Sequence, residues 1–229
     1  MSEALSAVQR LADIRGRIVK AGAQVGRDTS VVTLIAVSKT FSVEAIEPVI
    51  AAGHRAFGEN RVQEARAKWP ALKDKFPDVN LHLIGPLQSN KVRDALKLFD
   101  AIHSLDRESL AEALATELSK TGKQPILFVQ VNSGLELQKS GVIPKEAPSF
   151  VRRLREVHGL SPQGLMVIPP EADDPGPHFA LLRQLSKDCV LPLLSMGMSG
   201  DFETAVKLGA THVRVGSAIF GARQAVPEI

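Results

Sequence analysis

The sequence predicts a single (β/α)8 barrel of the TIM type, formed by residues 1–229, with one extra helix before the first strand. Three observations predict this fold. Apolar runs of strand length alternate with amphipathic stretches of helix length about eight times along the chain. With 229 residues and 44% hydrophobic content, the chain can bury one large core. Polar residues also gather directly after the predicted strands, where barrels of this type carry their sites.

The elements follow in order along the chain. The extra helix is predicted over residues 4–22, where apolar residues recur every three or four positions, at Leu5, Val8, Leu11, Ile14 and Ile18. The strands are predicted at 32–38, 54–58, 80–84, 101–105, 126–131, 164–168, 191–195 and 211–215. The helices between them are predicted at 43–52, 61–72, 90–99, 108–120, 147–157, 176–187 and 202–208. The first of these stops at Gly53, where a left-handed C-cap residue is expected.

An open, doubly wound sheet is the alternative for such an alternating pattern. A sheet of that kind usually carries a glycine-rich dinucleotide fingerprint after its first strand. Residues 38–41 of this chain, Ser-Lys-Thr-Phe, occupy that place instead, which favours the closed barrel. The polar residues expected at one rim of the barrel are Lys39, Glu59, Asn60, Gln88, Asn132 and Ser199.

Lys39 stands at the end of the apolar strand 32–38. Along a strand, Ile35, Val37 and Lys39 share one face, so the amine extends an apolar row. Apolar surroundings lower the pKa of a lysine, and a neutral amine can attack a carbonyl carbon to form a Schiff base. The alternative is a lysine that only reaches from the strand end into water.

The loops after the last two strands have the composition of a phosphate site. In barrels these loops commonly bind phosphate through backbone N–H groups and a short helix. Ser199 lies in the first of them and is either a phosphate contact or an ordinary N-cap of the next helix. Gly216 and Ser217 end the last strand, where a glycine has no evident packing purpose.

Arg214 is predicted to point into the barrel. On the last strand, His212, Arg214 and Gly216 share one face, and the valines between them suit the side that faces the helices. An unpaired guanidinium inside a barrel would be costly, so a ligand acceptor is expected beside it. An ion pair with Glu59 is the alternative.

Composition argues against several classes of function. The formal net charge is +3, from 28 basic and 25 acidic residues without a basic run, and aromatic residues make up 4% of the chain, so nucleic acid is not expected as a partner. No segment resembles a signal peptide or membrane span, so we expect a soluble, cytoplasmic protein. Cys189 is the only cysteine and is expected to be structural. His82, His103 and His158 lack metal-ligand spacing, so we expect no metal site.

A Schiff-base lysine, a phosphate-binding loop and an inward arginine together match the aldehyde, phosphate and ring nitrogen of pyridoxal phosphate. The chain also resembles the pyridoxal phosphate homeostasis protein family, which is similar to the N-terminal barrel domain of alanine racemase, fold type III. The resemblance covers nearly the whole chain. It is carried by AVSKT (36–40), FGENRVQE (57–64), IGPLQSNK (84–91), LSMGMS (194–199) and VRVGSAIFG (213–221).

This resemblance implies roles for individual residues. Lys39 would hold pyridoxal 5'-phosphate covalently, Asn60 would lie beside its ring, and Arg214 would meet its ring nitrogen. Met196 is a further candidate because a methionine there packs against either the ring or the core. The expected cofactor-binding residues are Lys39, Asn60, Met196, Ser199, Arg214, Gly216 and Ser217.

We expect a protein that stores, buffers or delivers the cofactor, with apo-enzymes as recipients, rather than an enzyme. An arginine stays protonated and donates to the ring nitrogen, which leaves a weaker electron sink. The chain contains no tyrosine, the residue type that alanine racemase uses as its second base. The racemase's second domain is not expected either, so we also expect a monomer. A weak racemase or a Schiff-base enzyme for a phosphorylated sugar is the alternative; a purely structural module would not explain the polar rim.

Overall fold

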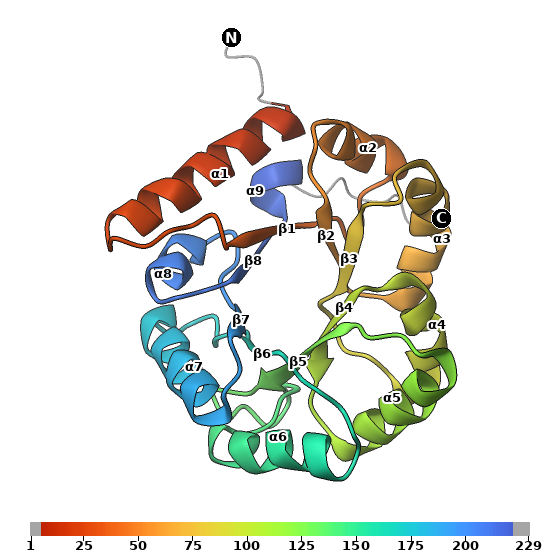
Figure 1. Cartoon of the computed structure of the whole chain (residues 1–229). Coiled ribbons are helices and arrows are strands. Elements are labelled where there is room, and N and C mark those ends of the chain that lie inside the picture. The colour runs from red at the N-terminus through yellow and green to blue at the C-terminus, as the bar shows by residue number, and fades with distance from the viewer. Residues whose placement is uncertain (1–5, 222–229) are drawn as a thin grey trace.

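Eight parallel strands close into a barrel in which each strand pairs with its neighbours along the chain and β1 pairs with β8 (Figure 1). The computed structural model describes residues 6–221. The strands are β1 (Thr33–Val37), β2 (Ala56–Glu59), β3 (Asn80–Leu83), β4 (Ala101–Leu105), β5 (Ile126–Val131), β6 (Gly164–Val167), β7 (Leu193–Ser195) and β8 (His212–Val215). The predicted barrel is therefore confirmed, and the open sheet is excluded.

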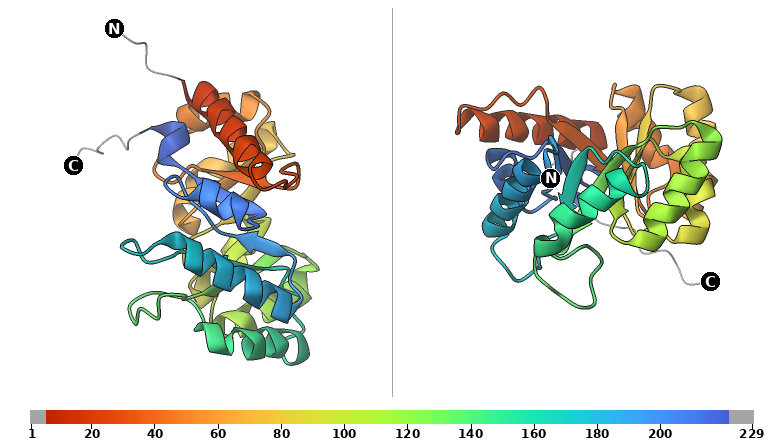
Figure 2. Two further views of the ribbon diagram at one scale, coloured as in Figure 1. Left: turned by 90° about the vertical axis from the view of Figure 1, so that its left-hand side faces the viewer. Right: turned by 60° about the horizontal axis from the view of Figure 1, so that its bottom comes forward.

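Helices surround the strands on the outside (Figure 1). They are α1 (Ala7–Ala23), α2 (Val43–Ala51), α3 (Val62–Lys75), α4 (Val92–Leu98), α5 (Glu108–Thr121), α6 (Ala147–Glu156), α7 (Pro175–Cys189), α8 (Phe202–Lys207) and α9 (Ser217–Phe220), with the 3-10 turns η1 (Ser89–Lys91) and η2 (Pro144–Glu146). The extra helix α1 begins after Ser6, whose hydroxyl accepts the N–H of Gln9. It lies alongside α8 and α9, the two helices that follow β7 and β8 (Figure 2).

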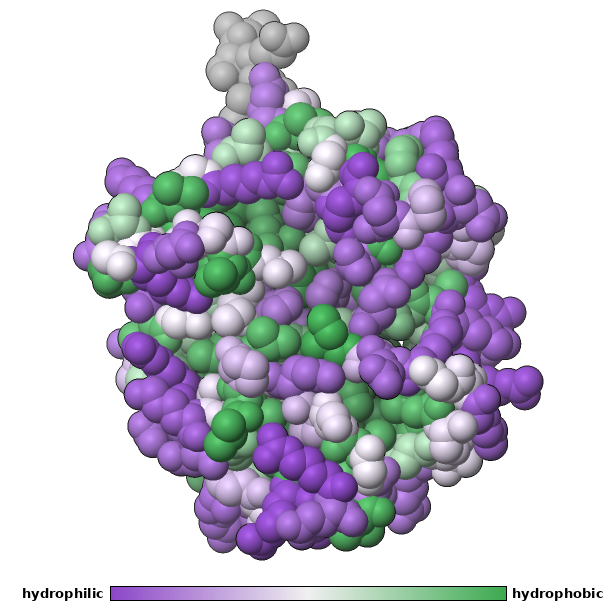
Figure 3. Space-filling view, in the orientation of Figure 1, coloured by the Kyte–Doolittle hydropathy of each residue, from purple (hydrophilic) through white to green (hydrophobic). Residues whose placement is uncertain are grey.

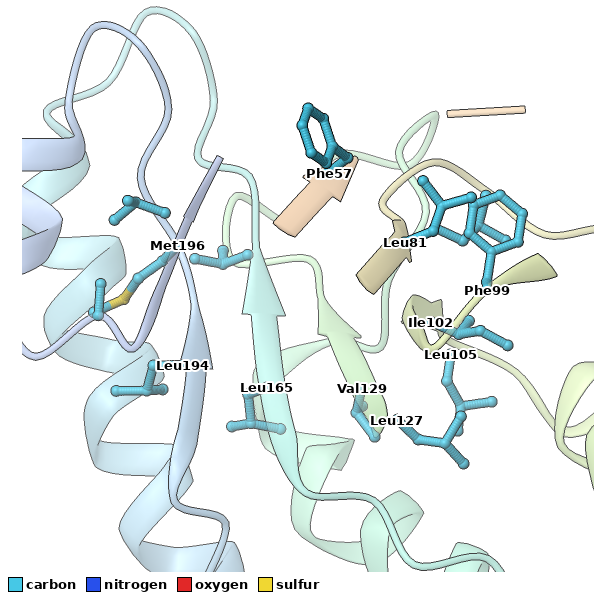
Figure 4. Packing of buried hydrophobic residues seen from close by; sticks show 14 of the residues in the cluster. Phe57, Leu81, Phe99, Ile102, Leu105, Leu127, Val129, Leu165, Leu194 and Met196 are labelled. Carbon is cyan, nitrogen blue, oxygen red and sulfur yellow. The ribbon is translucent and has the colours of Figure 1, made fainter. Parts of the chain in front are cut away.

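Hydrophobic residues form two layers of packing. The larger layer fills the space between the strands and the helices (Figure 4). In this layer the ring centroids of Phe57 on β2 and Trp69 on α3 lie 5.2 Å apart. The smaller layer fills the inside of the barrel and includes Ile35, Phe128 and Met166, all fully buried. Since side chains alternate along each strand, one set faces the helices and the other faces the barrel axis.

Most predicted boundaries differ from the structure by one or two residues. The strand predicted at 54–58 begins at Ala56, because His54 still closes the turn after α2 by donating its N–H to Val49. The strand predicted at 191–195 begins at Leu193, because Val190 is left-handed and Leu191 donates to Ser186. Gly53 is left-handed, with a φ of 86°, as predicted. Positions 4 and 5 of the predicted first helix lie outside the described residues.

Two further features bear on how the molecule meets its surroundings. Within residues 6–221, none of the helices has the length and apolar content needed to cross a membrane. On the face shown in Figure 3, polar and apolar side chains are mixed, with hydrophilic residues prominent around the periphery. Exposed apolar side chains on a protein surface are ordinary when they are interspersed in this way.

Candidate functional site

Lys39 is the second residue after β1 and is partly buried. Its neighbour Ser38 points toward the helices, where its hydroxyl bonds to Glu59 at 2.8 Å. Because side chains alternate along an extended chain, this orientation of Ser38 supports the prediction that Lys39 faces the barrel side. Thr40 then has a φ of 68°, a left-handed conformation that is unfavourable for a β-branched residue.

The turn after β1 is held from outside by a lysine of α3. The Nζ of Lys68 donates to the carbonyl oxygens of Ser38 and Phe41, at 3.1 and 3.2 Å. Lys68 also pairs with Glu64 at 2.9 Å, and Glu64 in turn accepts the N–H of Thr40. Lys68 and Glu64 thus hold the strained turn in place, and with it the residue that carries the amine. This role was not predicted from the sequence, although a Glu and a Lys four positions apart on a helix form a recognisable ion pair.

The loops after β7 and β8 come together through Ser199. Its hydroxyl oxygen accepts the N–H of Gly216 at 3.3 Å and lies 3.4 Å from the hydroxyl of Ser217. The residue that precedes α8 is Asp201, and its carboxylate accepts the N–H of Met198. The structure therefore decides one open alternative: in this structure Ser199 joins the last loop and is not the N-cap of α8.

These loops adjoin the strand that carries Lys39. A Cβ added at Gly216 would lie 3.3 Å from both the Cβ and the carbonyl oxygen of Val37. The aromatic rings of Phe41 and Phe220 also lie 4.9 Å apart, which joins the turn after β1 to α9. The chain thus brings a lysine and a cluster of hydroxyl and backbone N–H groups to one region of the rim.

Arg214 is buried inside the barrel, with 3% of its surface exposed. Its Nη1 donates to the hydroxyl of Ser195 at 2.6 Å, and its Nη2 donates to the carbonyl of Val167 at 2.9 Å. Burial lowers the pKa of Arg214 to about 10, with a smaller opposing influence from Asp201, so the group remains charged at neutral pH. A protonated guanidinium can only donate hydrogen bonds, and it offers five N–H groups to do so.

The alternative ion pair between Arg214 and Glu59 is wrong. Glu59 is fully buried on the side that faces the helices, where it pairs with Lys68 at 2.8 Å and accepts the indole N–H of Trp69 at 3.1 Å. No carboxylate among the described residues forms an ion pair with Arg214. The expectation that Glu59 belongs to the polar rim is wrong for the same reason.

Asn60 follows β2 and is held close to the loop after β3. A Cβ added at Gly85 would lie 2.3 Å from the carbonyl oxygen of Asn60, so only glycine permits this approach. Asn60 lines a hollow together with Gln130, Lys139 and Ile168. This places Asn60 at the edge of an open space, which fits a residue that lies beside a ligand.

The expectation that Met196 lies beside the cofactor needs correction. The side chain of Met196 is fully buried in the cluster between strands and helices, beside Leu194 (Figure 4), so it packs in the core and not at the rim. Asn132 binds the backbone of its own loop at Glu136 and Lys139, and it also lines the same hollow as Asn60. Gln88 is exposed, precedes η1 and lines a second hollow to which Asn60 also contributes.

Two of the histidines lie on neighbouring strands, His82 on β3 and His103 on β4, and both are buried. His82 and His103 contact one another inside the barrel, with 3.0 Å between Nδ1 and Nε2, and the ring of His212 lies 5.9 and 6.1 Å from theirs. Within residues 6–221, no cluster of His, Cys, Asp and Glu side chains has the arrangement of a metal site. Sequence gives no signal for this cluster, because its members come from β3, β4 and β8.

Comparison with known proteins defines the class first. The family described as alanine racemase, N-terminal domain matches residues 11–224. The alanine racemase of Acinetobacter baumannii shares the fold, with a TM-score of 0.68 over 94% of this chain and 62% of that one, at 18% identity. Fold and match together make this protein a barrel of the alanine racemase N-terminal class.

Relatives of higher identity define the family within that class. The pyridoxal phosphate homeostasis protein of Pseudomonas aeruginosa is 43% identical, over 94% of this chain and 95% of its own length. That of Aquifex aeolicus is 38% identical over 96% and 100%. The structure of PipY from Synechococcus elongatus with PLP bound has a TM-score of 0.80 and 38% identity, over 94% of this chain and 100% of that one. The chain belongs to the pyridoxal phosphate homeostasis protein family.

Proposed function

We propose that this protein binds pyridoxal 5'-phosphate at the rim of its barrel and serves vitamin B6 homeostasis by storing, buffering or delivering it. The observation that carries the proposal is the approach of Gly216 to Val37, two residues before Lys39. The approach keeps the amine of Lys39 and the proposed phosphate-binding loop on adjoining strands. Pyridoxal phosphate needs both groups close together, because it carries an aldehyde and a phosphate on one ring. The structure of the relative PipY, which has PLP bound, supports the same ligand.

The residues at the rim fit this cofactor. Lys39 would supply the primary amine, Arg214 an N–H for the ring nitrogen, and Asn60 a contact beside the ring. The phosphate would be held by hydroxyl and backbone N–H groups that already lie together: Ser199, Gly216 and Ser217. When bound, the cofactor supplies an aldehyde carbon to which an amine can bond.

The proposal assigns no robust catalytic activity to the protein. Arg214 is protonated at neutral pH and would donate to the ring nitrogen, which disfavours the pyridinium form that stabilises carbanions best. A racemase also needs an acid and a base on opposite faces of the substrate carbon, and the chain has no tyrosine for the second role. The relatives from Pseudomonas aeruginosa and Aquifex aeolicus are named as homeostasis proteins, which supports the same conclusion.

The proposal also covers the partners of the protein, its oligomeric state and its location in the cell. Enzymes that need pyridoxal phosphate and lack it would be the recipients, and the protein would act as a monomer in the cytoplasm. Light scattering of the purified protein tests whether it is a monomer. A stable dimer at micromolar concentration would contradict it.

Reconstitution tests the central proposal. Purified protein incubated with pyridoxal phosphate and freed of excess should absorb near the edge of the visible range, and borohydride should abolish that band. Transfer to an apo-enzyme should then be faster than transfer from free cofactor. A protein that stays colourless after reconstitution would contradict binding. Racemisation of an amino acid at about 1 per second or faster, a rate ordinary for enzymes, would contradict the non-catalytic role.

A further inference from the structure

Four polar side chains from four strands form a chain of contacts inside the barrel. They are His82 on β3, His103 on β4, Ser195 on β7 and Arg214 on β8, and each is at most 4% exposed. The Nδ1 of His82 lies 3.0 Å from the Nε2 of His103, and the Nδ1 of His103 lies 2.8 Å from the Ser195 hydroxyl. The Ser195 hydroxyl lies 2.6 Å from Nη1 of Arg214. This series of hydrogen bonds therefore ends at Arg214, the arginine of the candidate site.

Elementary hydrogen-bond chemistry gives this chain one direction. Arg214 can only donate, so the oxygen of Ser195 accepts from it and the hydroxyl hydrogen of Ser195 needs an acceptor. The Nδ1 of His103 is the acceptor that the described residues place within reach. If that nitrogen carried a proton instead, the buried hydroxyl hydrogen would be left without a partner, which is unfavourable.

The same reasoning sets the tautomers of the two histidines. With Nδ1 of His103 accepting, its single proton is on Nε2, which donates to Nδ1 of His82. His82 then carries its own proton on Nε2. Each neutral ring is an acceptor at one nitrogen and a donor at the other, so the four groups can satisfy one another in only one order.

The surroundings keep these rings neutral. Burial lowers the pKa of His82 to about 3 and lowers that of His103 well below its ordinary value. The other titratable groups that act on them are His212 and Arg214 within the barrel and Lys73 near His82, and each of these disfavours a further positive charge. The ring of His103 is also stacked on Phe128, with centroids 4.1 Å apart. A neutral, fixed ring is what a one-way chain requires.

We propose that Ser195 and His103 are positioning residues for Arg214, which they hold from inside the barrel through a one-way hydrogen-bond chain that ends at His82. With Val167 holding Nη2, this chain fixes the guanidinium plane against β6 and β7. The consequence for ligand binding rests on the proposed function, in which Arg214 meets the cofactor's ring nitrogen. An arginine side chain already held in one orientation loses less conformational entropy when it binds that nitrogen. The hydrogen-bond chain should therefore strengthen the binding of pyridoxal phosphate.

The tautomers can be tested without any cofactor. Long-range proton–nitrogen NMR of the full chain labelled with ¹⁵N-histidine distinguishes the two neutral tautomers. Near neutral pH, we expect His82 and His103 both to carry the proton on Nε2. We also expect Ser195→Ala to shift the Nδ1 signal of His103, because that nitrogen loses its donor. A wild-type His103 with its proton on Nδ1 would overturn the proposal.

The effect on the site is tested by cofactor affinity and absorbance. Ser195→Ala should raise the Kd for pyridoxal phosphate about tenfold, which corresponds to the loss of one hydrogen bond to a charged group, and should shift the bound absorption band. Ser104→Ala is the matched control, since Ser104 is a buried serine next to His103 whose hydroxyl has no partner. That control should stay within about twofold of wild type.

A second variant keeps the test decisive if Ser195→Ala fails to fold. His103→Phe retains a ring stacked on Phe128 but removes the acceptor of Ser195, and it should also weaken binding and shift the band. Wild-type affinity and band in both folded variants would overturn the inference. A wild-type protein that binds no pyridoxal phosphate would instead overturn the proposed function. In that case the histidine tautomers measured by NMR would still decide whether the hydrogen-bond chain from Arg214 to His82 exists.

Discussion

The ammonium of Lys68 lies 2.8 Å from Oε1 of Glu59, and the carboxylate of Glu59 is fully buried. Lys68 is itself only 11% exposed and also holds the backbone on both sides of Lys39 and Thr40. A buried ion pair of this kind is costly to break by removing one partner, because the other charge stays behind. The same contact thus links the core of the protein to the turn that carries the amine.

Replacing Lys68 by methionine should therefore destabilise the protein strongly. We expect Lys68→Met to lower the free energy of unfolding by about 3 kcal/mol, because it leaves the carboxylate of Glu59 buried without a counter-ion. Urea unfolding measures this change. The matched control is Lys75→Met on the same helix, whose pair with Glu47 is exposed and should cost less than about 1 kcal/mol. Equal losses in the two variants would contradict the role of Lys68.

Stability should fall in mild acid because several histidines are buried in neutral form. Burial, with smaller effects of nearby positive charges, lowers the pKa of His54 to about 4, that of His82 to about 3 and that of His212 to about 4. In the unfolded chain these pKa values return to about 6.5, so below that pH the unfolded state binds more protons. Their stabilisation is therefore complete above about pH 6.5 and is lost as the pH falls toward 4.

Each of these histidines should contribute a slope of about 1.4 kcal/mol per pH unit between about pH 6 and pH 4.5. Urea unfolding at a series of pH values measures the total slope. His54→Leu should reduce this slope by the contribution of one histidine. His54 suits this test because it lies outside the barrel interior, where its Nδ1 is 3.0 Å from Nη2 of Arg15. A free energy of unfolding that does not change over this range would contradict buried, neutral histidines.

Ser199→Ala should affect the phosphate and leave folding nearly unchanged. The hydroxyl of Ser199 contacts Gly216 and Ser217 and does not cap α8, so its loss should change the free energy of unfolding by less than about 1 kcal/mol. The Kd for pyridoxal phosphate should rise about tenfold, whereas binding of pyridoxal, which has no phosphate, should not change. An equal loss of affinity for pyridoxal phosphate and for pyridoxal would show that Ser199 does not act through the phosphate.

Gly197→Ala should disrupt the loop that follows β7. Gly197 has a φ of 91°, and an added Cβ would lie 2.5 Å from the Cβ of Ala205 on α8. Backbone strain and overlap together should cost about 2 kcal/mol or more of unfolding free energy. Gly200→Ala is the control in the same loop, because an added Cβ there meets no atom within 4 Å. A stable Gly197→Ala protein would contradict the tight approach of loop and helix.

The barrel could be predicted because its signal is local and repeated. Each strand is an apolar run and each helix an amphipathic one, so the alternation itself defines the order of elements. The orientation of Ser38 away from the barrel axis was predictable from the same alternation, and its bond to Glu59 supports the predicted direction of Lys39. Gly53 also gave a correct local signal for the end of α2.

The partners of the charged residues could not be predicted, because they come from distant parts of the chain. Arg214 was correctly expected inside the barrel, but its partner Ser195 lies on a strand of three residues, too short for a reliable alternation. Glu59 looked like a rim residue because it ends a strand, whereas Lys68 and Trp69 draw it into the helix layer. Met196 likewise follows the apolar face of its strand into the core.

The central claim is that the amine of Lys39 bonds the cofactor, and borohydride trapping with peptide mapping tests it most directly. Protein loaded with pyridoxal phosphate is reduced, digested and analysed by mass spectrometry. We expect the label on the peptide that contains Lys39 and its absence in Lys39→Ala, while the control Lys97→Ala, at an exposed position of α4, should be labelled like wild type. A label that persists in Lys39→Ala, or that lies on another lysine of the wild-type protein, would contradict the account.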